Sequence, residues 1–307
     1  MKSFIKKILF FFIVWTIISW VLDIFYTIKL KNSDIREIVI WNDILESRID
    51  ADIVFIGSSR AADHYQPEII DSILGTRSYN LGQYGQTIES DIIRYKLLRK
   101  YEDKTPFLYV WDVYFASFNC SSKFQDEQYT PFLFNKDIWT TVNSKSKHFS
   151  FFDKYIPLLR YWRKGIIPEY DALRSPIRGF VYNIDTWNPN EMANLKEESL
   201  TYSLDESMIS EFCSTIDTIK KGGSDVIIVF SPLHIKGQKA MQNLDNLIHI
   251  LDSIASTKQC IFANYLSDPI CHDSSYFKNA MHLNKEGTDF FSAKFAHLID
   301  SLNNLHP

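Results

Sequence analysis

Five short apolar runs alternate with helical patterns over most of the chain. The runs are IVFIG (53–57), SYNLG (78–82), FLYVWD (107–112), DVIIVFS (225–231) and QCIFAN (259–264). Apolar runs bounded by polar residues or Gly are typical of strands buried on both faces. Between them, apolar residues recur every three or four positions in 87–101, 206–221, 238–256 and 285–304, which indicates amphipathic helices. The alternation predicts a three-layer α/β/α domain around a parallel sheet.

The alternation stops between about 115 and 205. A structureless loop of this length is uncommon in a compact domain. We therefore expect an inserted cap beside the active-site edge of the sheet, within a domain that spans 51–307. The aromatic side chains of the cap either stack on sugar rings or pack the cap onto the core, and the sequence leaves both alternatives open.

The N-terminal segment from Ile8 to Ile28 reads ILFFFIVWTIISWVLDIFYTI, with Asp23 as its one charged residue. About 20 apolar residues suffice to cross a bilayer as a helix. Lysines at 2, 6 and 7 precede the segment, which favours a cytoplasmic N-terminus. Neither a small-residue cleavage site nor a Cys for lipid attachment follows it. We expect 1–30 to be an uncleaved membrane anchor, 31–50 a juxtamembrane connection with a short helix, and the rest of the chain to lie outside the cytoplasm. The alternative is a buried helix, but a lone helix that is apolar on all faces has no evident core.

Composition excludes some classes of function. The 307 residues carry a net charge of −4 without a Lys/Arg-dense run, so nucleic acid is not an expected partner. None of the cysteines, Cys120, Cys213, Cys260 and Cys271, has C-x-x-C spacing, and no His/Asp/Cys cluster has the spacing of metal ligands. We expect no metal and no cofactor. A Cys260–Cys271 disulfide and buried free thiols are both compatible with a location outside the cytoplasm.

The first strand ends in a serine-containing turn, GSSR. Ligands of parallel α/β sheets bind at the carboxyl ends of the strands, where Gly57, Ser58 and Ser59 are expected, followed by a helix over about 67–74. A serine at a strand-to-helix turn exposes its hydroxyl and offers its N–H to an oxyanion. Gly-Ser-Ser after a strand is also a common turn, so this motif alone does not define a catalytic site.

A histidine near the C-terminus is the second candidate. His282 stands in SSYFKNAMHLNKEGTDFFS, a polar loop before the last helix, which Asn284 or a neighbour is expected to cap. Such a His is usually structural, but together with a serine at a strand end it becomes a candidate base. We expect His64 and His272 to be surface histidines.

The pair resembles the SGNH hydrolases, also called GDSL esterases, and is most similar to their membrane-anchored acyl-transfer branch. The motifs FIGSSR, YNLGQYGQT and NAMHLNKEG carry the resemblance, which covers about 50–115 and 222–305 and leaves out the cap. The resemblance implies a flavodoxin-like SGNH-hydrolase fold. It also implies that Ser59 is the nucleophile, that the N–H groups of Ser59 and Gly82 bind the oxyanion, and that His282 is the base.

Two departures from the family pattern affect the chemistry. The triad acid of the family stands three residues before the histidine, and that position here is Asn279. An Asn carbonyl can orient an imidazole but supplies no charge, so a Ser59–His282 dyad, or a substitute acid such as Asp273 or Asp268, remains open. The Gly-x-Asn-Asp block is also absent, because the third strand ends in VWDVYFASF.

Further polar residues at the same sheet edge are candidates for binding substrate: Arg60, Asp112, Ser231 and His234. A structural role at the strand end is the alternative for Ser231 and His234, and an ion pair with Asp63 or Asp112 is the alternative for Arg60. The resemblance implies an acylated glycan or a small ester as substrate, and a membrane protein that donates the acyl group. Three alternatives remain open from the residues: acyl transfer to a sugar hydroxyl, plain ester hydrolysis, and a non-catalytic relative that binds a glycan or a protein.

Overall fold

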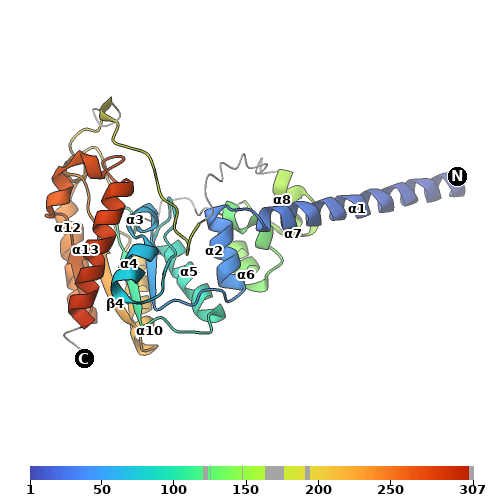
Figure 1. Ribbon diagram of the computed structural model, residues 1–307. Coiled ribbons are helices and arrows are strands. Elements are labelled where there is room, and N and C mark those ends of the chain that lie inside the picture. Colours follow the sequence, from blue (N-terminus) through green and yellow to red (C-terminus); the bar gives the residue numbers. More distant parts are fainter. Residues whose placement is uncertain (120–123, 125, 147, 163–175, 191–193, 304–307) are drawn as a thin grey trace. The chain divides into compact units, whose positions relative to one another are not determined.

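The computed structural model describes residues 1–119, 124, 126–146, 148–162, 176–190 and 194–303 (Figure 1). The chain forms two compact units. The first unit joins Met1–Asn42 to Phe124–Ser175, and the second joins Asp43–Lys123 to Pro176–Pro307.

The second unit is built on a five-stranded parallel sheet with the order β2-β1-β3-β4-β5. This order is the flavodoxin-like form of the doubly wound α/β fold. The strands are β1 (Ile53–Gly57), β2 (Ser78–Asn80), β3 (Leu108–Asp112), β4 (Asp225–Phe230) and β5 (Ile261–Asn264). Each strand lies in one of the predicted apolar runs, so the predicted parallel sheet is confirmed.

Helices cover both faces of the sheet. They are α3 (Ser59–His64), α4 (Pro67–Leu74), α5 (Ile88–Tyr101), α10 (Glu206–Lys221), α11 (Ile235–Ala240), α12 (Leu244–Lys258) and α13 (Lys285–Asn303). On one face, Phe55 and Val110 pack with Phe291 and Phe295 of α13. The opposite face carries Trp111, whose ring lies edge-on to that of Phe212 of α10 at 5.2 Å. The predicted three-layer α/β/α architecture is confirmed.

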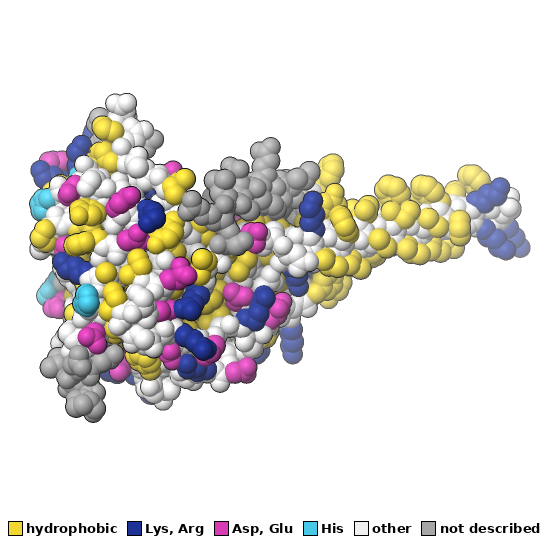
Figure 2. All heavy atoms as spheres, in the orientation of Figure 1, with side chains coloured by type: hydrophobic (Ala, Val, Ile, Leu, Met, Phe, Trp, Pro, Cys, Tyr) yellow, Lys and Arg dark blue, Asp and Glu magenta, His cyan; other side chains and the backbone are white. Residues whose placement is uncertain are grey.

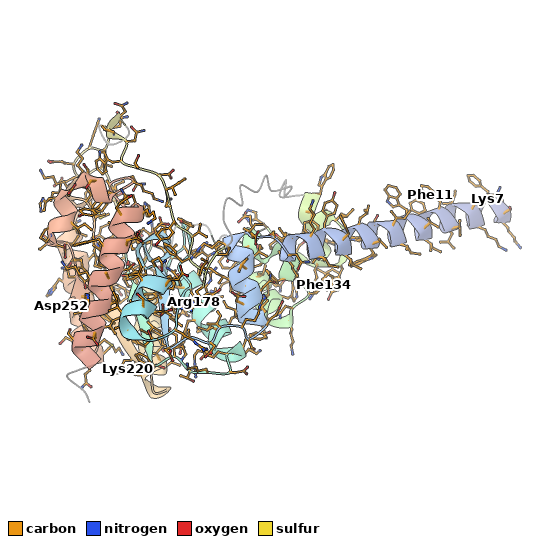
Figure 3. All side chains as sticks on the ribbon, viewed as in Figure 1. Lys7, Phe11, Phe134, Arg178, Lys220 and Asp252 are labelled. Carbon is orange, nitrogen blue, oxygen red and sulfur yellow. The ribbon has the colours of Figure 1, made fainter. Side chains whose placement is uncertain are left out.

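The first unit contains the long helix α1 (Lys2–Lys31) and the helices of the expected cap. These are the 3-10 helix η1 (Glu127–Phe132), α6 (Lys136–Lys145), α7 (Phe151–Tyr155) and α8 (Leu159–Trp162); α2 (Arg36–Leu45) crosses the boundary between the units. By length and composition, α1 is able to cross a membrane. Hydrophobic side chains cover α1, and Lys7 and Phe11 project from it (Figures 2 and 3). The expected position of the cap beside the active-site edge stays a prediction.

The described cysteines are free thiols: Cys213, Cys260 and Cys271. The disulfide alternative for Cys260–Cys271 is therefore wrong. The Cys271 thiol is buried, and its Sγ donates to the Tyr265 carbonyl at 3.2 Å, whereas Cys260 donates to the Lys258 carbonyl at 3.6 Å. Each of these two thiols thus donates to a backbone carbonyl close to it in the sequence, and the two sulfurs are not bonded to each other. Cys120 lies outside the described residues.

Candidate active site

The end of β1 presents Ser59 at the carboxyl edge of the sheet. Gly57 has φ 145°, and a Cβ there would lie 2.4 Å from the Asp112 carbonyl oxygen, so this position requires glycine. Ser58 follows in extended conformation, and Ser59 is the first residue of α3. The helix predicted over 67–74 is present as α4. The sequence patterns missed α3, because six residues that include only two apolar ones show no clear period.

The loop that carries His282 is closed on itself before α13. Phe277 and Leu283 pair as an antiparallel bridge, and the Lys278 N–H donates to the His282 carbonyl at 3.0 Å. Asn284 accepts the Gly287 N–H on its Oδ1 at 3.0 Å, which is the predicted cap of the last helix. The imidazole is therefore presented by a short loop with fixed ends.

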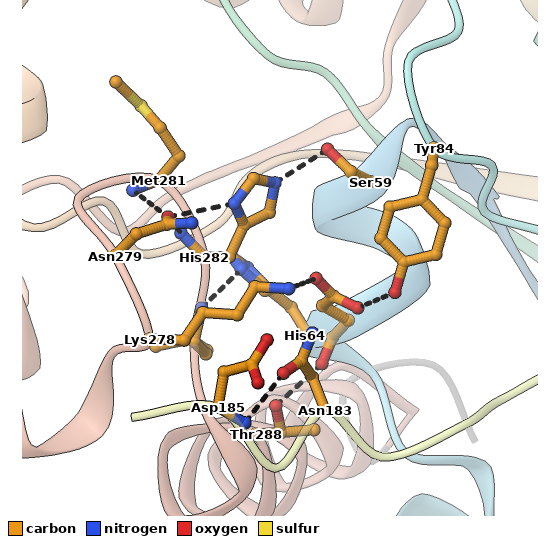
Figure 4. A network of polar contacts seen from close by, with 12 residues as sticks. Ser59, His64, Tyr84, Asn183, Asp185, Lys278, Asn279, Met281, His282 and Thr288 are labelled. Atoms are coloured by element: carbon orange, nitrogen blue, oxygen red, sulfur yellow. Dashed lines mark hydrogen bonds and ion pairs between the residues drawn. The ribbon is translucent and has the colours of Figure 1, made fainter. Parts of the chain in front are cut away.

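Ser59, His282 and Asn279 form one hydrogen-bonded chain (Figure 4). The His282 Nε2 lies 2.8 Å from the Ser59 Oγ, and its Nδ1 lies 3.0 Å from the Asn279 Oδ1. The same Oδ1 accepts the backbone N–H groups of Met281 at 2.9 Å and His282 at 3.0 Å. An atom that accepts two N–H groups must be the amide oxygen, so Nδ1 carries the imidazole proton. The Nε2 lone pair is then free to accept the Ser59 proton.

The other two candidate acids lie in different local structures. Asp273 caps the 3-10 helix η3 (Ser274–Tyr276) by accepting the Ser275 N–H at 2.9 Å. Asp268 caps η2 (Pro269–His272) by accepting the Ile270 N–H at 3.2 Å. Since both His282 nitrogens are already engaged, Asn279 is the residue that orients the imidazole.

The environment of His282 favours the neutral imidazole. Burial lowers the pKa of His282 to about 4; Asp63 acts in the opposite direction, and the positive charges of Lys278 and Arg60 lower the pKa further. An Asn carbonyl cannot offset this as a carboxylate would. His282 is thus neutral, with Nε2 unprotonated, over the physiological pH range.

A second set of contacts joins α3 to the loop of His282. Asp63 lies one turn after Ser59, and its Oδ2 pairs with the Lys278 Nζ at 2.9 Å. Its other carboxylate oxygen accepts the Tyr84 hydroxyl. Figure 4 shows the side chains of Lys278 and Tyr84 near the Ser59–His282 pair. Sequence reasoning missed this pair, although the i, i+4 spacing from Ser59 places Asp63 on the same face of α3.

The surface role expected for His64 is wrong. His64 is fully buried, and its Nε2 accepts the Leu283 N–H at 3.1 Å. Its Nδ1 therefore carries the proton and donates to the Ser231 Oγ at 2.8 Å. Burial holds the pKa of His64 well below its ordinary value. His64 thereby connects α3 both to the end of β4 and to the residue that follows His282.

Three of the residues expected to bind substrate lie buried beneath the site. Arg60 donates from Nε and Nη2 to the Ser231 Oγ at 3.1 and 2.9 Å, and the Tyr65 hydroxyl donates to the Asp112 Oδ2 at 2.8 Å. Burial raises the pKa of Asp112, and the positive charge of Arg60 opposes that effect. These contacts favour a supporting role for Arg60, Asp112 and Ser231 over the predicted contact with substrate.

His234, the fourth of these residues, serves the end of β4. Its Nδ1 accepts the Lys236 N–H at 3.2 Å at the start of α11. Its ring lies 4.4 Å from that of Trp187 and 5.3 Å from that of Phe277. This packing fits the structural alternative at the strand end, and a contact with substrate stays a prediction.

The oxyanion donors are only partly available. Ser59 opens α3, where the first N–H groups of a helix have no intrahelical acceptor. The Gly82 N–H, by contrast, donates to the Asn80 Oδ1 at 2.9 Å. Glycine is needed there for packing, because a Cβ would lie 2.2 Å from the Ala62 N. The oxyanion role of Gly82 therefore stays a prediction, and it requires that the bond to Asn80 be exchanged.

Within the described part of the chain, no group of three or more His, Cys, Asp or Glu residues could hold a metal ion.

Comparison with known proteins gives likeness in structure alone. No protein-family model and no curated protein matches the chain. A candidate platelet activating factor from Streptococcus pneumonia is 11% identical with TM-score 0.47, covering 91% of this chain and 97% of that one. A GDSL-like lipase from Bacteroides thetaiotaomicron is 13% identical with TM-score 0.41, covering 81% and 88%. The acetyl xylan esterase AlAXEase is 11% identical with TM-score 0.42, covering 80% and 98%. At identities and TM-scores this low, the function of this chain has to be argued from its own residues.

Proposed function

We propose that this chain is a membrane-anchored serine acyltransferase or esterase of the SGNH type. It acts on ester-linked acyl groups of a cell-surface or exported polysaccharide. The observation that carries the proposal is the hydrogen-bonded chain Ser59–His282–Asn279, in which a serine at a strand end meets the unprotonated nitrogen of a half-buried histidine.

In the proposed reaction, His282 Nε2 removes the Ser59 proton while Oγ attacks the ester carbonyl. The tetrahedral oxyanion lies at the start of α3, where the Ser59 N–H is available; loss of one such donor typically costs about 3 kcal/mol of transition-state stabilisation. When the ester C–O bond breaks, His282 returns the proton to the leaving alcohol and acyl-Ser59 remains. His282 then deprotonates water or a sugar hydroxyl, which takes the acyl group and frees Ser59.

Asn279 has a defined and limited part in this mechanism. Its carbonyl fixes the imidazole tautomer and orientation, which is one of the two roles of the triad carboxylate. The second role, stabilisation of the imidazolium, depends on charged groups that do not contact the imidazole. Asp63 raises the pKa of His282, but its ion pair with Lys278 weakens that effect. The base is therefore well oriented but weakly basic.

The N-terminal helix supports transfer over hydrolysis. A helix of this length and composition is able to anchor the chain, and the lysines before it favour a cytoplasmic N-terminus. The remainder would then lie in the periplasm or outside the cell, where it can receive an acyl group from a membrane protein and meet an exported glycan. Because no residue of the site distinguishes water from a sugar hydroxyl, this part of the proposal depends on the anchor and on the family resemblance.

The proposal is tested with the full-length protein in detergent micelles. Release of p-nitrophenol from p-nitrophenyl acetate is measured with and without an oligosaccharide acceptor, beside Ser59→Ala. We expect release that requires Ser59, and acetylated oligosaccharide in the products. Release without transfer would favour a plain esterase, whereas no release from the folded wild type would favour a non-catalytic glycan-binding or partner-binding relative.

A further inference from the structure

Aromatic rings form a continuous series from α1 to the exposed surface of the first unit. Trp20 of α1 lies 6.1 Å from Phe134, which lies 6.2 Å from Tyr155 of α7. Tyr155 lies 4.4 Å from Phe151, and Phe151 lies 6.1 Å from Phe152. Figure 3 shows Phe134 beside α1. The rings thus lead from the membrane-length helix outward over its own unit.

Much of this series is exposed, together with neighbouring apolar side chains. We define the aromatic surface as the exposed residues Phe134, Phe151, Phe152, Tyr155, Ile156 and Trp162. Trp162 is 85% exposed and Phe151 62%. Ring contacts join Phe134, Tyr155, Phe151 and Phe152 into one patch. Contiguous exposed apolar patches are uncommon on soluble proteins and mark surfaces that contact another phase or partner.

A buried ion pair fixes α8 to one level of α1. Asp23 pairs with Arg160, and both side chains are buried. Asp23 also accepts the Leu158 N–H at 2.8 Å. One turn further along α1, the Thr27 hydroxyl contacts the Arg160 Nη2 at 3.0 Å and the Tyr161 hydroxyl at 2.5 Å. Helix α8, which carries Trp162 and packs against α7, is therefore attached to α1 at the level of Asp23.

The length of α1 determines how deep that level lies. At about 1.5 Å per residue, the helix rises about 24 Å from Lys7 to Asp23, less than the hydrocarbon core of about 30 Å. Counted from Lys2, the rise is about 32 Å, which barely crosses the core. Even there, Asp23 would lie in the interfacial zone, because headgroups widen the bilayer to about 40–45 Å.

The exposed face of α1 supports the same depth. Beyond Asp23, the side chains of Ile24, Phe25 and Ile28 remain 54–60% exposed. The apolar face of α1 therefore continues past the ion pair to Ile28, while α8 contacts the other side of the helix through Arg160. The parts of the unit that are attached at Asp23 therefore lie at the same membrane depth as this apolar face of α1.

We propose that the aromatic surface lies in the acyl-headgroup boundary of the bilayer that α1 spans, with lipid as its occupant. This inference rests on the anchor of the proposed function and extends it from one helix to a membrane-seated unit. Aromatic side chains are enriched at this boundary, and ionisable residues at membrane depth pair with one another, as Asp23 and Arg160 do. A second protein would have to enter the same depth beside α1, so lipid is the favoured occupant.

The test uses the full-length protein in phosphatidylcholine–phosphatidylglycerol vesicles that contain a lipid with a diazirine in its acyl chain. After photolysis, lipid adducts are mapped by mass spectrometry. We expect adducts on α1 and on at least three residues of the aromatic surface. Ile184 and Phe290, exposed apolar residues of the second unit, serve as controls and should carry at least tenfold fewer adducts.

The outcomes separate this inference from the proposed function. Adducts on α1 without adducts on the aromatic surface would overturn the inference and leave the anchor intact. Absence of adducts on α1 would overturn the anchor and the inference together, while reaction of Ser59 with a serine-directed probe would still report on the site. In the double variant Phe151→Ser/Phe152→Ser, adducts at Trp162 should fall severalfold, and in Phe290→Ser they should not; equal labelling in both variants would contradict a lipid-facing surface.

Discussion

At the residue scale, the distinctive feature of the site is that the His282 imidazole is oriented by an amide, Asn279, and not by a carboxylate. The Asn279 Oδ1 is fixed by two backbone N–H groups, so it presents oxygen, not nitrogen, to the His282 Nδ1. Asn279 therefore orients the imidazole but does not supply the negative charge that would stabilise the imidazolium. Asn279 and His282 could be proposed from the sequence because they share one motif, whereas the direction of the amide depends on backbone groups that only the folded loop brings together.

Substitution of Asn279 tests this distinction between orientation and charge. Asn279→Asp keeps the acceptor and adds a charge beside the imidazole, which should raise the pKa of His282 and increase kcat/KM at neutral pH on the order of 10-fold. Asn279→Leu removes the acceptor and should lower kcat by at least about 100-fold. Both are measured with p-nitrophenyl acetate. If Asn279→Asp folds but is less active, the missing negative charge beside His282 does not limit the activity of the base.

The pH dependence of the reaction follows from the lowered pKa of His282. His282 acts as base only when neutral, and burial lowers its pKa to about 4. Activity should therefore persist as pH falls through about 6.5, the ordinary value for His, and decline only near pH 4. A kcat/KM profile between pH 3.5 and 8 measures this. An acid limb centred near 6.5 would contradict a desolvated imidazole in the free protein.

At the element scale, the site depends on contacts between α3 and the loop before α13. Asp63 pairs with Lys278, and His64 accepts the Leu283 N–H. The positions of the strands and of most helices along the chain could be predicted, because the apolar runs and periodic stripes are long enough to show their period. The helix α3 could not be predicted because it is too short to show a period. The burial of His64 could not be predicted because it depends on Ser231 and Leu283, which are 167 and 219 residues away in sequence.

The Asp63–Lys278 pair should contribute more than a surface ion pair. The Asp63 side chain is fully buried and that of Lys278 nearly so. Lys278→Met leaves a buried carboxylate without its cation, and such losses cost about 3–5 kcal/mol. The double variant Asp63→Asn/Lys278→Met should recover at least half of that loss. Urea denaturation of the wild type and the three variants measures the coupling, and additive losses would show that the two side chains do not interact.

At the scale of the whole molecule, the second unit holds His64 and His282 as neutral imidazoles, the first fully buried and the second half-buried. Their pKa values are lowered in the folded state, mainly by burial. Below about 6.5 the unfolded chain binds more protons than the folded chain, so the stability that is present above this pH is lost as pH falls toward the folded-state pKa values. The site thus couples the stability of the unit to pH.

The free energy of unfolding should therefore decrease as pH is lowered from 6.5 to 5. Each histidine contributes about 1.4 kcal/mol per pH unit once its unfolded form is fully protonated. In His282→Gln the slope should be smaller by about that amount. Urea titrations at several pH values measure both slopes. A wild-type stability that does not change over this range would contradict the burial of neutral imidazoles.

If Ser59 is a nucleophile activated by His282, a serine-directed probe should label it covalently. The full-length protein in detergent micelles is treated with a fluorophosphonate probe, and the adduct is mapped by mass spectrometry beside Ser59→Ala and His282→Ala. We expect an adduct on Ser59 that is absent in Ser59→Ala and at least about 100-fold slower to form in His282→Ala. A folded wild type that stays unlabelled, or labelling of Ser59 that does not depend on His282, would show that Ser59 is not a nucleophile activated by His282.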